Sequence, residues 1–263
     1  MINIDEDDRN ADWIKQVPPG SALFNGKRPP KKTQTPRGPD GRWQIIASAA
    51  DLKYTEDQPR DERGRFSGAG SAGEAADFTR AIPGIKNVVG AEDAPLHVQN
   101  IVNRGLDGMQ KAGYGMPETI SYEQRPDDPG LAAQYDRFKD TLTVNTAGSR
   151  WQGTEEEIAK NAARDGRVGR LSTGLPEHPI LHELAHREHF ESAPTSAGGS
   201  PYFARLDEAD PGVDHVSAYA GDTPQEFVAE THAGMVSGKS YPDDVMRVYD
   251  KYRGPAVKGT YGG

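Results

Sequence analysis

Hydrophobic positions are spread unevenly along the chain, and the first 75 residues hold too few of them to form a core. Pro- and Gly-rich runs at 18–20 and 36–41 favour polyproline II and turns. Two short apolar islands, at 13–14 and 43–47, suit anchors on another surface better than a core. We therefore expect residues 1–75 to form an extended, mostly disordered arm that ends in a charged linker.

From residue 76 onward, apolar positions recur at the spacings of helices and strands. Positions 95–112 repeat every three to four residues, which predicts a helix that stops at Gly113. Alternating positions predict three strands, the second of them weaker than the others: 118–123, 135–138 and 141–145. This mixture favours an α+β fold.

The second half of the chain carries further helical patterns. Thr154 precedes three glutamates, a typical N-cap followed by an acidic first turn. Thr223 as N-cap, with Pro224 at the first helical position and Glu226 at the third, has the pattern of a capping box. The expected helices span about 154–163, 177–191, 223–236 and 242–252. We expect one domain over 76–255 and a flexible tail over 256–263.

Composition and charge narrow the chemistry. Hydrophobic residues are 34% of the 263, with 30 Gly and 20 Pro, so part of the chain lacks the apolar surface for a core. The formal net charge of −9 argues against a protein that binds nucleic acid through phosphate contacts. The chain has no cysteine, so histidines and carboxylates must hold any bound metal.

The N-terminal residues bear on location. Residues 1–8 are acidic and lack the basic and apolar regions of a signal peptide. No apolar run approaches the length that crosses a bilayer. We expect neither signal-directed secretion nor a membrane contact, and a protein made in a cytoplasm.

The strongest chemical motif is His182-Glu183-x-x-His186, within the helix expected at 177–191. Residues four apart lie one turn above each other on a helix, so both imidazoles can face one ion. Glu183 lies beside that face, where it can take a proton from a metal-bound water. The motif predicts a zinc site.

A catalytic zinc ion needs a third protein ligand, with water in the fourth position. One common pattern places a third histidine ten residues after the first, but Ser192 stands there. Candidates further along the chain are Asp210, Asp214, His215, Glu226, Glu230 and His232. Glu226 and Glu230 share a helix face, so one can bind the metal while the other orients a ligand histidine.

Taken with the histidine motif, Tyr219 and the run Glu226-Phe-Val-Ala-Glu230 resemble the catalytic domain of anthrax lethal factor and related zincin peptidases. The resemblance covers about residues 176–252, and Val228 departs from it by replacing an aromatic residue. It implies a zincin-like fold, with a small sheet, a helix bearing the histidine motif and a helix bearing the glutamates. It also implies residue roles: His182, His186 and Glu226 as Zn²⁺ ligands, Glu183 as general base, Tyr219 as donor to the oxyanion, and Glu230 as hydrogen-bond partner of a ligand histidine.

A second resemblance lies at residues 58–66, Gln-Pro-Arg-Asp-Glu-Arg-Gly-Arg-Phe. This string is similar to one in head-morphogenesis and minor capsid proteins of tailed bacteriophages. It implies a phage origin, a place in the virion or the host cytoplasm, and capsid or portal proteins as partners of the arm. The function expected is a zinc endopeptidase acting on protein or peptide. The alternatives are a structural head protein that keeps the fold with little turnover, and an effector peptidase aimed at host protein.

The other histidines receive lesser roles. His178 and His189 flank the motif on the same helix, where they can shape the pocket, but solvated or helix-capping positions are favoured for them. For His232 we expect a structural position. His97 has no partner evident in the sequence, and His215 lies close enough to Tyr219 to enter the cleft.

Overall fold

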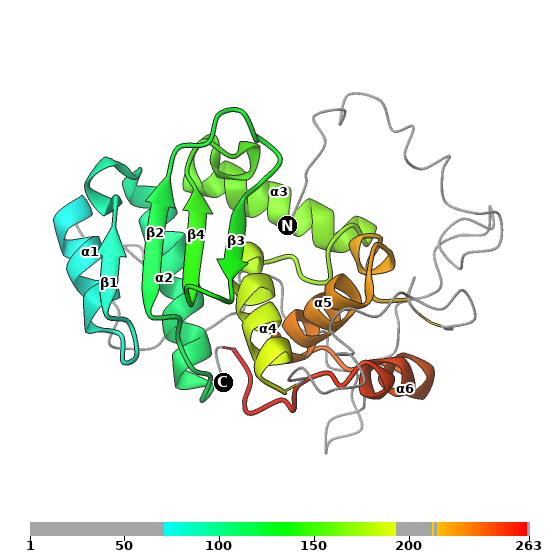
Figure 1. Ribbon diagram of the computed structural model, residues 1–263. Helices are drawn as coiled ribbons and strands as arrows, with labels where there is room; N and C mark the ends of the chain where they lie inside the picture. The colour runs from blue at the N-terminus through cyan, green and yellow to red at the C-terminus, as the bar shows by residue number, and fades with distance from the viewer. Residues whose placement is uncertain (1–70, 193–211, 213–214, 262–263) are drawn as a thin grey trace, which may run out of the picture.

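The computed structural model describes residues 71–192, 212 and 215–261, and within them the expected α+β fold is confirmed (Figure 1). The helices are α1 (Ala72–Ala81), α2 (Leu96–Lys111), α3 (Glu155–Val168), α4 (His178–Ser192), α5 (Pro224–Val236) and α6 (Asp243–Lys251). The strands are β1 (Asn87–Val89), β2 (Thr119–Glu123), β3 (Ala133–Asp136) and β4 (Thr141–Asn145). Short 3₁₀ turns lie at Ala91–Asp93, Ser149–Trp151 and Tyr219–Gly221. None of the helices described is long and apolar enough to span a membrane.

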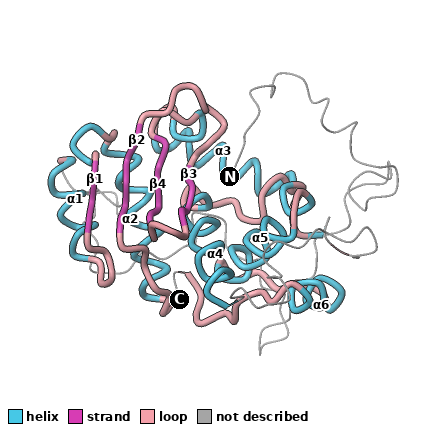
Figure 2. The backbone as a smooth tube through the Cα atoms, in the orientation of Figure 1, coloured by secondary structure: helices cyan, strands magenta, loops and turns pink. Residues whose placement is uncertain are grey.

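The four strands form a mixed sheet in the order β1-β2-β4-β3 (Figure 2). β1, β2 and β4 run parallel, and β3 pairs antiparallel with β4 at the edge. Buried side chains such as Ile120, Leu142 and Val144 join the core beneath the sheet. The antiparallel edge strand β3 is the part of the sheet that packs against α4.

Most of the expected elements are present, with differences at their ends. α3 ends at Val168, five residues beyond the expected end. The residue that stops it is Gly169, which forms the C-cap with a left-handed backbone (φ 75°). The weak strand expected at 135–138 lies instead at Ala133–Asp136, and Phe138 is 84% exposed beyond it. β1 was not expected, because three residues are too few to show the alternation of apolar and polar positions typical of a strand.

The domain also begins earlier than the expected residue 76. Ser71 caps α1 by accepting a hydrogen bond from the Glu74 backbone N–H, and Ala75 and Thr79 are buried. The Asn103 side chain of α2 donates to the Ala75 carbonyl at 2.9 Å. Residues 71–75 therefore belong to the folded unit, and the rest of the expected arm, residues 1–70, lies outside the described residues.

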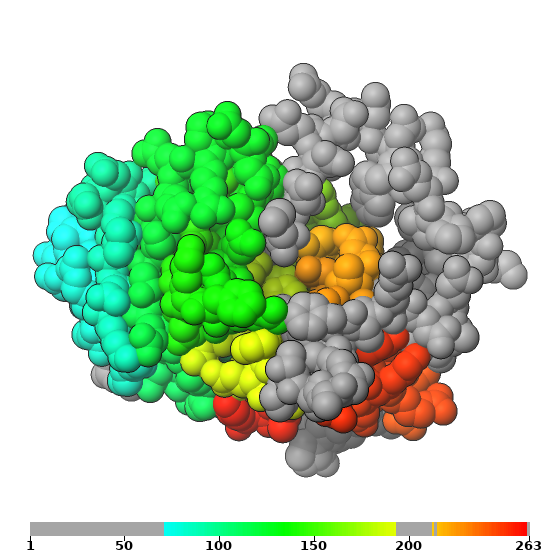
Figure 3. Space-filling view, viewed as in Figure 1, coloured from blue at the N-terminus to red at the C-terminus, as the bar shows by residue number. Residues whose placement is uncertain are grey.

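Two apolar clusters form the interior. The larger one joins α1, α2 and the sheet to α4 through Ile180, Leu181 and Leu184. The smaller one joins α5 to α6, around Phe227 and Tyr249. Figure 3 shows the sheet half of the molecule, in cyan and green, beside the half with α5 and α6, in orange and red. α4 and α5 pack together where the two halves meet.

Close packing also fixes α4 against α2. A Cβ atom on Gly105 would lie 2.9 Å from Cβ of Ile180, closer than packed side chains approach. Gly105 thus lets the two helix backbones come together, and this contact sets the position of the histidine-bearing helix relative to the sheet.

The segment expected to be a flexible tail is packed against the domain. The Lys258 backbone N–H donates to the Tyr114 hydroxyl at 3.0 Å, and the Lys258 ammonium contacts Glu188 at 2.7 Å. The Tyr261 N–H donates to the Val236 carbonyl at 2.7 Å. Residues 256–261 therefore contact α4, α5 and the loop that follows α2, which corrects the expectation of a loose tail. Residues 262–263 lie outside the described part.

Two histidines help to hold this C-terminal region. His189, expected to be solvated or capping, is instead fully buried, with Nε2 2.8 Å from the Tyr252 carbonyl. His232 is buried as expected of a structural residue, with Nδ1 2.8 Å from the Tyr249 hydroxyl. His97 has a partner after all, the Trp151 carbonyl at 3.0 Å. Burial lowers the pKa of both His189 and His232 to about 4.

The start of the domain can be tested by truncation. A fragment of residues 71–263 should unfold cooperatively, whereas a fragment of residues 76–263 should be less stable by about 1–3 kcal/mol, because it loses the cap and the first four of the 10 residues of α1. Urea denaturation followed by circular dichroism measures the difference. Equal midpoints for the two fragments would place the boundary at residue 76.

The buried histidines predict acid sensitivity. Because their pKa is lowered to about 4, the imidazoles of His189 and His232 stay neutral in the folded state. In the unfolded state the same imidazoles bind protons below about pH 6.5. The free energy of unfolding therefore has its full value above about pH 6.5. It falls as the pH drops towards 4, by up to about 1.4 kcal/mol per pH unit for each histidine. In EDTA, His232→Phe should lose less stability than the wild type between pH 7 and pH 5. Parallel losses would show that His232 does not titrate in this way.

Candidate metal centre

The two motif histidines face the same side of α4. His182 is fully buried and His186 nearly so, and their rings lie edge to face with centroids 4.7 Å apart. Pro179 in the first turn suits the start of this helix, because its missing N–H has no partner to lose there. The helix is buried around most of its circumference, so the imidazoles are held between packed layers.

The third ligand candidate comes from the first turn of α5. Oε2 of Glu226 lies 2.8 Å from Nε2 of His182 and 3.4 Å from Nε2 of His186. Thr223 caps the helix as expected, accepting from the Glu226 backbone N–H at 3.2 Å. The Glu226 carboxylate itself points to the histidines, so the fold brings together the three residues that the resemblance implies.

Two of the separations among these three residues can be compared with those of a zinc site. Ligands 2.0–2.2 Å from a tetrahedral ion lie about 3.3–3.6 Å from one another. The separation of His186 and Glu226, 3.4 Å, already has this value. The 2.8 Å between His182 and Glu226 is a hydrogen-bond distance, and it has to open by about half an ångström to admit the ion.

The other candidate ligands do not join this group. His215 is about half exposed, and its Nδ1 lies 3.8 Å from Oδ2 of Asp244. His232 is engaged with Tyr249 on the far side of α5 from Glu226 and Glu230. Asp210 and Asp214 lie outside the described residues.

Glu183 is held by one oxygen only. Its Oε2 accepts a hydrogen bond from the Tyr135 backbone N–H on β3 at 2.8 Å. Its Oε1 is buried and has no hydrogen-bond partner among the described residues. The carboxylate is therefore fixed in direction while one oxygen remains able to accept a proton.

A second contact ties β3 to α4 beside Glu183. The Arg187 guanidinium donates to Oδ1 of Asp140 at 3.0 Å, and the Tyr135 hydroxyl donates to the same oxygen at 2.7 Å. These bonds hold the pKa of Asp140 below its usual value against the opposing effect of burial. They fix the distance between the edge strand and the helix, and with it the position of the Glu183 carboxylate.

Tyr219 lies on the short turn before α5. Its ring centroid is 5.6 Å from that of His182, and its backbone N–H donates to the Arg170 carbonyl at 3.3 Å. Burial, and next the negative charge of Glu226, raise the pKa of the phenol. Tyr219 therefore stays protonated near the histidines and can act as a hydrogen-bond donor.

Glu230 lies one turn further along α5 and reaches the other side of the His182 ring. Its Oε1 is 2.8 Å from Nδ1 of His182. Its Oε2 accepts from the Ser172 backbone N–H at 2.6 Å and from the Ser217 hydroxyl at 2.8 Å. The two glutamates thus occupy opposite sides of one imidazole, Glu226 towards Nε2 and Glu230 towards Nδ1.

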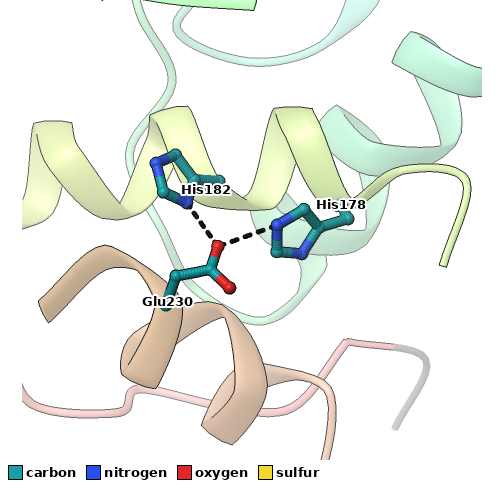
Figure 4. A group of neighbouring side chains, drawn as sticks. All are labelled: His178, His182 and Glu230. Carbon is teal, nitrogen blue, oxygen red and sulfur yellow. Dashed lines mark hydrogen bonds and ion pairs between the residues drawn. The ribbon is translucent and has the colours of Figure 1, made fainter. Parts of the chain in front are cut away.

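His178 belongs to the site, although we expected it to be solvated or capping. It is fully buried on α4, and its Nε2 lies 2.8 Å from Oε1 of Glu230 (Figure 4). The sequence signal was its spacing, since positions 178, 182 and 186 repeat every four residues along one helix face. Ser172 and Ser217 carry no comparable signal, because tertiary contacts alone bring them to Glu230.

Comparisons with protein-family models, with curated proteins and with solved structures give no match.

Charge in the site is balanced by the histidines. Burial by itself lowers the pKa of His182, but hydrogen bonds to Glu226 and Glu230 outweigh it and raise the pKa to about 10. Against the cost of their own burial, the histidines hold the pKa values of both glutamates well below the usual range. A metal ion bound between His182 and Glu226 would therefore displace a proton.

Because the two glutamates lie on opposite sides of the His182 ring, their substitution should reduce zinc affinity to different extents. Glu226→Gln should nearly abolish zinc binding, because it weakens a ligand that faces both Nε2 atoms. Glu230→Gln should weaken binding about 10- to 100-fold, the usual effect of losing a partner of a ligand histidine. Zinc titration against a chromophoric chelator orders the two variants. If Glu230→Gln were the more damaging, the assignment of the ligand would be reversed.

Proposed function

We propose that this chain is a zinc-dependent endopeptidase with a zincin-like catalytic domain. The observation that carries the proposal is the Glu183 carboxylate, which is anchored by Tyr135 through one oxygen and has an oxygen within 4.8 Å of a ring nitrogen of both motif histidines. A zinc site that only supports the fold has no use for such a base, so this arrangement favours turnover over a purely structural head protein.

The residues divide the chemistry between them. His182, His186 and Glu226 would hold the ion, which, when bound, lowers the pKa of water and polarises a carbonyl group. Glu183 accepts the proton of the attacking water at Oε1 and passes it to the leaving amine. The bond from Tyr135 to the other oxygen, Oε2, holds the carboxylate in place.

Tyr219 supplies the remaining polar group. As a neutral phenol beside His182, it donates a hydrogen bond to the oxyanion that develops on the substrate carbonyl. A well-aimed donor of this kind is worth about 3 kcal/mol in the transition state. Its place on the turn leading into α5 links it to the same helix that carries Glu226.

The substrate class and the setting come from the sequence. The base, the metal ligands and the phenol suit addition of water to a carbonyl, and the resemblance to zincin peptidases makes a peptide bond the proposed target. The phage-like string at 58–66 lies outside the described residues and supports a virion- or assembly-associated peptidase. An effector peptidase acting on host protein would use the same site.

The test separates the base from the ligands. Glu183→Gln should retain about one zinc per chain and lose activity about 10²- to 10⁴-fold, because it removes the base and no ligand. Elemental analysis and cleavage of a quenched fluorescent peptide library measure the two properties. Glu191→Gln, a half-exposed glutamate of the same helix, serves as the control with full activity.

Two outcomes would contradict the proposal. Wild-type protein with bound zinc and no cleavage would favour the structural alternative. Equal cleavage by Glu183→Gln and wild type would mean that another base, or a contaminating protease, accounts for the activity.

A further inference from the structure

Behind His182, a second set of polar groups extends away from the candidate metal site. Oε1 of Glu230 lies 2.8 Å from Nδ1 of His182 and also 2.8 Å from Nε2 of His178 (Figure 4). Nδ1 of His178 is in turn 3.0 Å from the Thr173 hydroxyl. The two histidines and Glu230 are fully buried and Thr173 nearly so, so water does not compete for these contacts.

His178, His182 and Glu230 have the side chains of a metal site, but their geometry does not suit a second ion. Both nitrogens are 2.8 Å from one oxygen, the distance of a hydrogen bond. If Nε2 of His182 binds the first ion, a second ion on Nδ1 would require the ring to lose both of its protons and bridge two metals. The other oxygen of Glu230 already accepts two hydrogen bonds. Protons rather than a metal therefore connect these groups.

The direction of each proton follows from the partners. A carboxylate oxygen only accepts, so Nε2 of His178, 2.8 Å from Oε1 of Glu230, carries a proton. In the neutral ring Nδ1 is then the acceptor, and the Thr173 hydroxyl donates to it. In the same way, Nδ1 of His182 donates to Glu230 and leaves Nε2 as the metal-binding nitrogen.

We propose that His178 is a positioning residue, which holds the Glu230 carboxylate so that Glu230 can orient His182 for metal binding. This inference rests on the proposed zinc site and adds a residue to it. Oε2 of Glu230 is fixed by Ser172 and Ser217, and Oε1 by the two histidines. Without His178, only the contact with His182 remains on Oε1, and the carboxylate can turn away from it.

Replacing His178 should reduce zinc affinity moderately. The contact of His178 with Glu230 is short but bent, so that the N–H bond is poorly aligned for a hydrogen bond and the attraction is mainly electrostatic. His178 also acts on the ligand through Glu230 and not directly. We therefore expect the loss to fall at the lower end of the 10- to 100-fold range typical of residues that support metal ligands.

The role of His178 can be tested by replacing it with glutamine or with asparagine, whose side-chain amides differ in length. In His178→Gln the amide nitrogen reaches about as far as Nε2 and can still donate to Glu230, whereas in His178→Asn it reaches only about as far as Nδ1. Zinc binding by the full chain should weaken about tenfold in His178→Asn and less than threefold in His178→Gln. His189→Asn is the matched control, because His189 is an equally buried histidine of α4 that contacts Tyr252 instead.

Further measurements distinguish an effect of His178→Asn on the metal ligand from a loss of folded stability. The visible absorption spectrum of the Co²⁺-loaded protein should change in His178→Asn and not in His189→Asn, since only the former disturbs a metal ligand. In a Glu230→Gln background, His178→Asn should add less than a twofold loss of zinc affinity, because its route to the metal is already broken. Thermal midpoints in EDTA report any loss of stability independently.

The failures are distinguishable. If the wild type binds neither zinc nor cobalt, the proposed function fails and this inference falls with it. If the wild type binds zinc while His178→Asn and His189→Asn bind it equally well, only the role of His178 is overturned. Equal weakening by His178→Asn and His178→Gln would also overturn it, because the donor to Glu230 would then be irrelevant.

Discussion

The contact between α4 and α5 places ionisable groups where water is nearly excluded, and the arrangement of the site follows from this constraint. A buried carboxylate is costly unless donors surround it, and Glu230 accepts from Ser172, Ser217 and His182 while facing His178. The histidines in turn require the glutamates, because burial opposes their charged forms. α4 and α5 thus stabilise each other only when their polar side chains meet in this register.

The sheet supplies the fixed reference for this pair of helices. β3 receives the Glu183 carboxylate through the Tyr135 backbone N–H, and the Arg187 contact with Asp140 holds the same strand to α4. On the other side, Gly105 of α2 allows α4 to approach closely. A base that must stay directed at one point benefits from such rigid support, since small displacements reduce the effectiveness of general base catalysis.

The residues after α6 take part in the same framework. Lys258 contacts Glu188 of α4, and Tyr261 reaches Val236 at the end of α5. Composition gave no indication of this, because a short segment with glycines and few apolar residues is typical of a loose end. A few hydrogen bonds to buried partners are enough to hold it, and their positions depend on helices distant in the sequence.

Local chemistry in the sequence determined much of this protein. The four-residue spacing of His182 and His186, the cap at Thr223 and the periodicity of α2 depend only on neighbouring residues, so the α+β class, most helices and the candidate ligands could be predicted. The tertiary structure alone decided which nitrogen of His182 meets which glutamate, that His178 is buried against Glu230, and that Tyr135 anchors Glu183. These relations join segments more than forty residues apart, and no local pattern encodes the packing that brings such segments together.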